Sequence, residues 1–75
     1  MMDVISRKMA FREKAARDGE TVSAAAIKAC GVTPYHLTEG LAGRRPLSAA
    51  VKQRFADYIG RSVEEVFGDA ADNAA

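Results

Sequence analysis

The sequence predicts an all-α fold of five short helices, and three observations support this prediction. Apolar side chains recur at helical spacing in the longer segments. Residues that favour helix N-termini precede several segments, and a glycine follows each of them. The chain also lacks the regular alternation of apolar and polar residues that is typical of β-strands.

The first two helices are expected over residues 3–18 and 23–30. In the first, apolar residues recur at near-helical spacing with arginine and lysine between them, and Gly19 ends the segment. These apolar residues are Val4, Ile5, Met9, Phe11, Ala15 and Ala16. The second helix is rich in alanine, which favours helix, and Gly31 ends it.

The third helix is expected to begin after Thr33 and to end at Gly43. Threonine is a good N-cap, and proline at position 34 suits the first helical turn. Leu37 and Leu41 are four residues apart and should point inward.

Two more helices complete the predicted domain, which covers residues 1–68. Ser48 caps a helix that runs to about Ile59, and residues 62–65 form a capping box that opens a short final helix. The expected apolar anchors are Val51, Phe55, Tyr58, Ile59, Val63, Val66 and Phe67. Residues 69–75 are expected to be a disordered acidic tail, because they contain no apolar side chain larger than alanine.

Composition argues against several functional classes. The chain contains one cysteine, Cys30, and one histidine, His36, which are too few for a structural zinc site, and Cys30 is expected to be a buried thiol. Because no catalytic or cofactor-binding motif is present, we expect no enzyme activity, no cofactor and no metal. The charged N-terminus suits neither a signal peptide nor a membrane span, so a cytoplasmic location is expected.

Charge is unevenly distributed along the chain. Residues 1–61 contain all eleven lysines and arginines and six acidic residues, whereas residues 62–75 contain four acidic residues and no base. A basic body with an acidic tail suits a polyanionic ligand, although an ordinary solvated surface can have the same balance.

Residues 23–43 have the layout of a helix-turn-helix, in which two short helices are joined at Gly31 and the second is offered to the DNA major groove. The sequence resembles the XRE-like DNA-binding family, the λ-repressor and Cro type of phage regulator, from about residue 11 to residue 67. The segments that carry the resemblance are 29–33, 37, 43–46 and 55–67. The resemblance implies a five-helix λ-repressor-like domain.

Several positions depart from the family pattern. Ile27 replaces a small residue, Gly40 replaces a bulky one, and Leu41 stands where a glutamate is usual. We expect the side chain of Ile27 to fill the space left at Gly40, so that Gly40→Leu would create a clash. Pro34 lacks the polar side chain that relatives often carry there.

The resemblance also implies roles for individual residues. Phosphate contacts fall to the start of the second helix and to the loop after the third, and base contacts fall to the outward face of the third helix. The phosphate candidates are Ser23, His36, Arg44 and Arg45, with Arg7, Arg12, Lys14 and Lys28 as weaker ones. The base-contact candidates are Thr33, Tyr35, Thr38 and Glu39. Glu39 could instead pair with a nearby arginine, and Tyr35 could cover apolar surface.

The expected function is sequence-specific binding of double-stranded DNA by a repressor-like transcription regulator that acts by occupying its operator. A homodimer is expected, because a core this small is marginal and self-association would stabilise it. Apolar residues near Val4 or Phe67 are candidates for the dimer surface. Two alternatives stay open: the antitoxin of a toxin–antitoxin pair, and a protein-interaction module that has lost DNA binding. The protein partner would then be a toxin or a polymerase.

Overall fold

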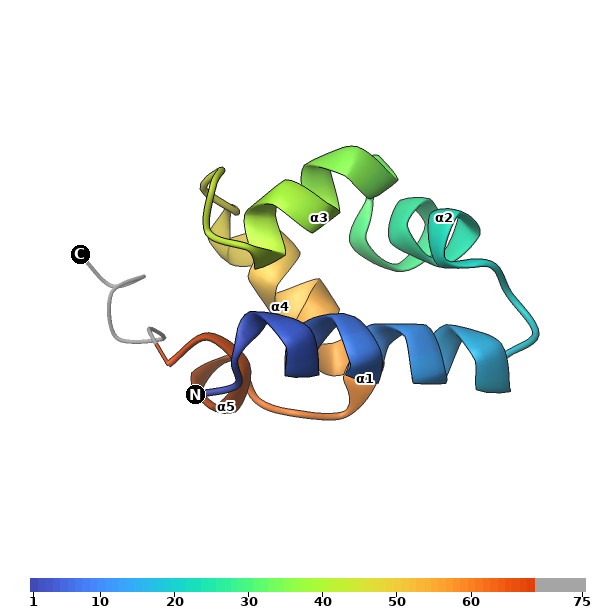
Figure 1. The fold of residues 1–75 in the computed structure, drawn as a ribbon, viewed down its shortest axis with the longest axis horizontal. Coiled ribbons are helices and arrows are strands. Elements are labelled where there is room, and N and C mark those ends of the chain that lie inside the picture. Colours follow the sequence, from blue (N-terminus) through green and yellow to red (C-terminus); the bar gives the residue numbers. More distant parts are fainter. Residues whose placement is uncertain (69–75) are drawn as a thin grey trace.

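The computed structural model describes residues 1–68, in which five α-helices and one π-helical segment are connected by short loops (Figure 1). The elements are α1 (Val4–Arg17), α2 (Val22–Ala25), the π-helical segment η1 (Ala26–Cys30), α3 (Pro34–Leu41), α4 (Ala49–Ile59) and α5 (Val63–Phe67). No residue from 1 to 68 belongs to a strand, so the prediction of an all-α fold is confirmed for this range. The predicted disorder of residues 69–75 lies outside it.

Side-chain caps determine where the helices begin. The predicted caps Thr33, Ser48 and Ser62 each accept a backbone N–H three residues later, and Ser62 forms the complete capping box. The predicted start of the second helix is wrong by one residue. The hydroxyl of Thr21 accepts the N–H of Ala24 at 3.1 Å, which makes Val22 the first helical residue.

The second helix also changes its winding before it ends. Residues 26–30 form a π-helical turn, a rare conformation that was not predicted from the sequence. Gly31 then adopts a φ of 74°, a left-handed conformation that favours glycine, and the chain turns into α3.

An aromatic cluster joins α1, α4 and α5. Phe11 stacks on Phe55 with ring centroids 5.3 Å apart, and Phe67 meets Phe55 at 5.8 Å. Leu37 and Leu41 attach α3 to this core and are each 3% exposed, so their predicted inward orientation is confirmed. In Figure 1, α1 runs across the front of the molecule, α2 and α3 lie above it, and α4 lies behind it.

The buried face of α1 differs from the predicted one. It contains Arg7, Phe11 and Ala15, at four-residue spacing, so Ile5 and Met9 point away from the core and are 69% and 53% exposed. Only some of the regularly spaced apolar residues of this segment, such as Phe11 and Ala15, are therefore buried.

Arg7 is the buried charged side chain of the described core and connects three helices. Its Nη1 donates to the carbonyl oxygen of Leu41 at 2.8 Å, and its Nε donates to that of Val66 at 3.1 Å. The guanidinium carbon also lies 5.0 Å from the centre of the Phe67 ring. Because both carbonyls belong to the last turns of α3 and α5, the cation meets the negative ends of two helix dipoles.

The residue that occupies the space beside Gly40 is Leu47, and the predicted pairing of Gly40 with Ile27 is wrong. A methyl group at Gly40 would lie 2.5 Å from Cγ of Leu47, whereas the side chain of Ile27 is largely exposed. The loop that follows α3 therefore folds back over this helix and leaves no room for a side chain at position 40.

Within residues 1–68, no helix combines the length and the apolar character that crossing a membrane requires.

Candidate nucleic-acid interface

Tyr35 and Thr38 form an exposed polar ridge on α3, whereas Leu37 and Leu41 face the core. Tyr35 is 65% exposed, and Thr38 is exposed next to it. Another of the four predicted base-contact residues, Thr33, accepts the backbone N–H of His36 with its hydroxyl oxygen at 3.1 Å. Thr33 therefore acts as the N-cap of α3, and its hydroxyl already has one hydrogen-bond partner.

Glu39 and Arg44 form a bidentate ion pair on the side of this ridge. Nε of Arg44 donates to both carboxylate oxygens of Glu39 at 3.0 Å, and Nη2 donates to Oε2 at 2.9 Å. The hydrogen bonds from Arg44 lower the pKa of Glu39, and the same contact raises the pKa of Arg44. Glu39 therefore pairs with an arginine, which is one of the two roles that the sequence allowed for it.

The backbone of Glu39 also holds the loop. Its carbonyl oxygen accepts the N–H of Arg44 at 2.9 Å and that of Arg45 at 3.3 Å. Arg45 then extends back along α3, where its guanidinium carbon lies 5.5 Å from the centre of the Tyr35 ring. The structure therefore brings together four of the predicted residues, Tyr35, Glu39, Arg44 and Arg45, on one side of α3.

The other two phosphate candidates lie apart from this cluster. Ser23 is exposed in the first turn of α2, and His36 is half-buried on α3. Within residues 1–68, the side chain of neither makes a hydrogen bond or ion pair to the loop arginines.

The weaker phosphate candidates differ in whether another group already binds their charge. Arg7 is buried, so its interpretation as a surface charge is wrong. Lys14 pairs with Asp18 at 2.7 Å, and Lys28 pairs with Glu20 at 2.8 Å. Arg12 remains exposed on α1.

A groove that the sequence reasoning missed lies between α1, α2 and α3. Its volume is about 220 Å³, and Lys8, Arg12 and Thr38 line it together with buried apolar side chains. Those apolar residues include Phe11, Leu37 and Leu41. The four-residue spacing of Lys8 and Arg12, each one place beyond a buried residue of α1, was the signal that could have revealed it.

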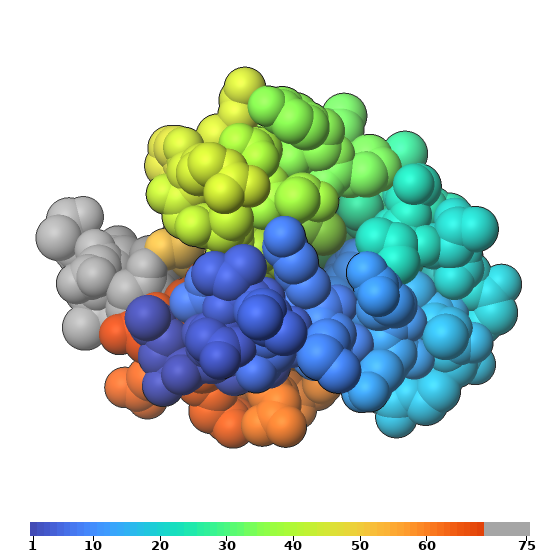
Figure 2. Space-filling view, in the orientation of Figure 1, coloured from blue at the N-terminus to red at the C-terminus, as the bar shows by residue number. Residues whose placement is uncertain are grey.

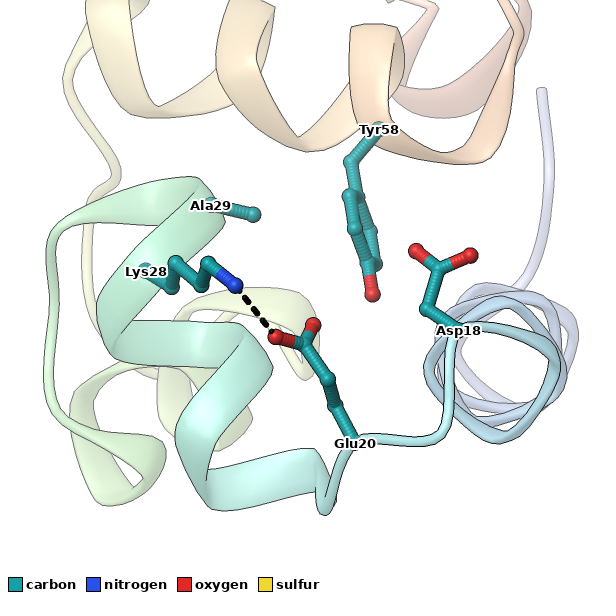
Figure 3. A pocket seen from close by; sticks show the side chains of 5 residues that line it. All are labelled: Asp18, Glu20, Lys28, Ala29 and Tyr58. Atoms are coloured by element: carbon teal, nitrogen blue, oxygen red, sulfur yellow. Dashed lines mark hydrogen bonds and ion pairs between the residues drawn. The ribbon is translucent and has the colours of Figure 1, made fainter.

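A second depression, shown in Figure 3, lies between the C-terminal end of α1, the α2–η1 helix and α4. The Tyr58 hydroxyl points into it near Asp18 and Glu20 and has no hydrogen-bond partner within the described residues. Burial, more than the nearby carboxylates, raises the pKa of Tyr58. Both carboxylates already pair with lysines, so this depression offers no net charge to a ligand.

Cys30 is fully buried, as predicted. Burial raises the pKa of its thiol to about 11, so the sulfur is protonated at neutral pH and is a poor nucleophile. Between residues 1 and 68, no group of three or more histidine, cysteine, aspartate or glutamate side chains is arranged to hold a metal ion.

Comparisons with models of protein families, with curated protein sequences and with solved structures found no match. The resemblance to the XRE-like family therefore rests on the sequence motifs alone.

Proposed function

We propose that this chain binds double-stranded DNA as a λ-repressor-like helix-turn-helix domain and regulates transcription by occupying its operator. In this proposal the helix-turn-helix consists of the α2–η1 helix, the turn at Gly31 and α3. The observation that carries the proposal is the exposed polar ridge of α3, which has two arginines held beside it by Glu39 and Tyr35. A helix with an exposed polar face and adjacent cations suits the DNA major groove and its phosphate borders.

The geometry suggests different roles for the candidate residues. Tyr35 and Thr38 are exposed and can contact base edges, whereas Glu39 acts as a positioning residue for Arg44. Arg44 and Arg45 bind phosphates, since their loop projects beside the ridge and their side chains are exposed. Ser23 and His36 are secondary phosphate contacts in this scheme.

The double substitution Arg44→Gln/Arg45→Gln is expected to weaken DNA binding and to reduce its salt dependence. Each phosphate contact contributes about 0.9 to the slope of log K against log salt, so the loss of two contacts should reduce the slope by about 1.8. Fluorescence anisotropy with a mixed-sequence duplex about three helical turns long, titrated at several salt concentrations, measures this slope.

The matched control is Arg17→Gln/Arg61→Gln, which removes the same charge at the end of α1 and before α5. Its slope should stay close to that of the unmodified protein. If the unmodified protein shows no salt-dependent binding at low ionic strength, the DNA-binding proposal is wrong, and a protein-interaction module becomes the better interpretation.

A protein contact on α1 is favoured by a separate observation. Ile5 and Met9 lie one helical turn apart on the outward side of α1, and both are more than half exposed. The other predicted location of the dimer surface is near Phe67, and Phe67 itself is buried in the core. We propose that Ile5 and Met9 form part of a homodimer contact.

Replacing both residues, as Ile5→Lys/Met9→Lys, is expected to convert the dimer into monomers without loss of helix content, because neither side chain belongs to the core. Sedimentation equilibrium and circular dichroism measure the two properties. Ser6→Lys, an exposed position on the same helix, is the control. An unmodified protein that is monomeric at all concentrations would rule out the dimer but leave DNA binding open.

A further inference from the structure

The ridge of α3 has cations on both of its sides. On one side, Arg44 binds Glu39, and Arg45 lies over Tyr35. On the other side, Thr38 shares a groove with Lys8 and Arg12 of α1. Thr38 and Glu39 are consecutive residues of α3, so their side chains point in directions about 100° apart around the helix. Figure 2 shows α1 (blue) packed directly against α3 (green), and residues of both helices line the groove.

Lys8 and Arg12 are the two cations of α1 that line this groove. Arg7 is buried against backbone carbonyls, and Lys14 pairs with Asp18. Within residues 1–68, neither Lys8 nor Arg12 forms an ion pair. Both side chains therefore border the groove outside any ion pair, and the charge of Lys8 adds to the larger effect of Arg44 in lowering the pKa of Glu39.

The position of these two residues fits a duplex better than it fits an isolated anion. A helix that enters the major groove, which is about 12 Å wide, meets phosphates of one strand on one side and of the other strand on the opposite side. The loop arginines provide cations for only one of these sides.

We propose that Lys8 and Arg12 bind phosphodiester groups of the DNA strand that lies across the major groove from the strand bound by Arg44 and Arg45. The Thr38 hydroxyl, which lines the same groove, lies between this pair and the base edges. This inference rests on the proposed DNA binding. It assigns α1 a direct part in the interface, in addition to its part in the core.

The test uses Lys8→Gln/Arg12→Gln in the full chain with the same mixed-sequence duplex. Loss of two phosphate contacts should reduce the salt slope by about 1.8 relative to the unmodified protein. The charge-conserving exchange Lys8→Arg/Arg12→Lys should keep the slope, and Arg17→Gln/Arg61→Gln is again the control for net charge. Thermal unfolding shows whether each variant is folded. If the double variant is unfolded, Arg12→Gln alone, at an exposed position, should reduce the slope by about 0.9.

The strand assignment is tested by phosphate-ethylation interference on a duplex selected for binding from a random pool. The unmodified protein should show interference on both strands, and Lys8→Gln/Arg12→Gln should lose it on one strand only. An unchanged salt slope in a folded variant, beside steep salt dependence of the unmodified protein, would overturn this inference and leave the proposed function intact. Absence of DNA binding by the unmodified protein would overturn both.

Discussion

Replacing Arg7 with alanine is expected to lower the free energy of unfolding by about 3 kcal/mol. The substitution leaves the carbonyl oxygens of Leu41 and Val66 without their buried donor and removes the cation from the Phe67 ring. A chain of this size has a total stability of roughly 3–9 kcal/mol, so the variant should retain only about 0–6 kcal/mol. Urea denaturation followed by circular dichroism measures the change.

Two further variants show whether the guanidinium itself matters. Arg7→Lys keeps the charge but lacks the planar group that reaches both carbonyls, so it should recover only part of the lost stability. Arg12→Ala removes an exposed arginine from the same helix and should change stability by less than about 0.5 kcal/mol. A loss for Arg7→Ala as small as that for Arg12→Ala would show that the bridge contributes little.

Replacing Gly40 with leucine is expected to destabilise the protein by about 2–3 kcal/mol, although leucine favours helix more than glycine does. The new side chain would overlap Leu47, whose Cγ lies only 2.5 Å from the position of a Cβ atom at Gly40, well inside van der Waals contact. Thermal unfolding of Gly40→Leu and of the smaller change Gly40→Ala measures the effect.

A double-mutant cycle with Leu47→Ala identifies the cause. When Leu47 is shortened, the space beside position 40 opens, so Gly40→Ala should become stabilising by up to about 1 kcal/mol through helix propensity. If Gly40→Ala raised the melting temperature of the protein with Leu47 intact, the close approach of these residues would not be a constraint.

Local signals in the sequence predicted most of the secondary structure. Hydroxyl caps at Thr33 and Ser48 and the capping box at Ser62 are short-range features, so the helices that they begin were predicted correctly. The burial of Leu37 and Leu41 also followed from four-residue spacing.

Features that depend on tertiary contacts could not be predicted in this way. Arg7 was interpreted as a surface charge, because its acceptors are carbonyl groups distant in the sequence. The partner of Gly40 lies in the following loop, and no pattern of residues singles out Leu47 for that role. Within the candidate interface, the sequence predicted the basic loop but not the groove, since the groove requires α1 to pack beside α3.

The hydrogen bond from Arg7 of α1 to the last turn of α3 affects which residues of α3 can change without loss of the fold. Arg7 contacts the main chain at Leu41 and Val66, so the bond does not depend on which side chains occupy these positions. The exposed residues of α3, which read DNA in the proposed function, can therefore be exchanged while the orientation of the helix is maintained. A library that randomises Tyr35 and Thr38 but preserves Arg7 and Gly40 should consequently contain many folded members, and under the proposed function these members should differ in the DNA sequence that they prefer.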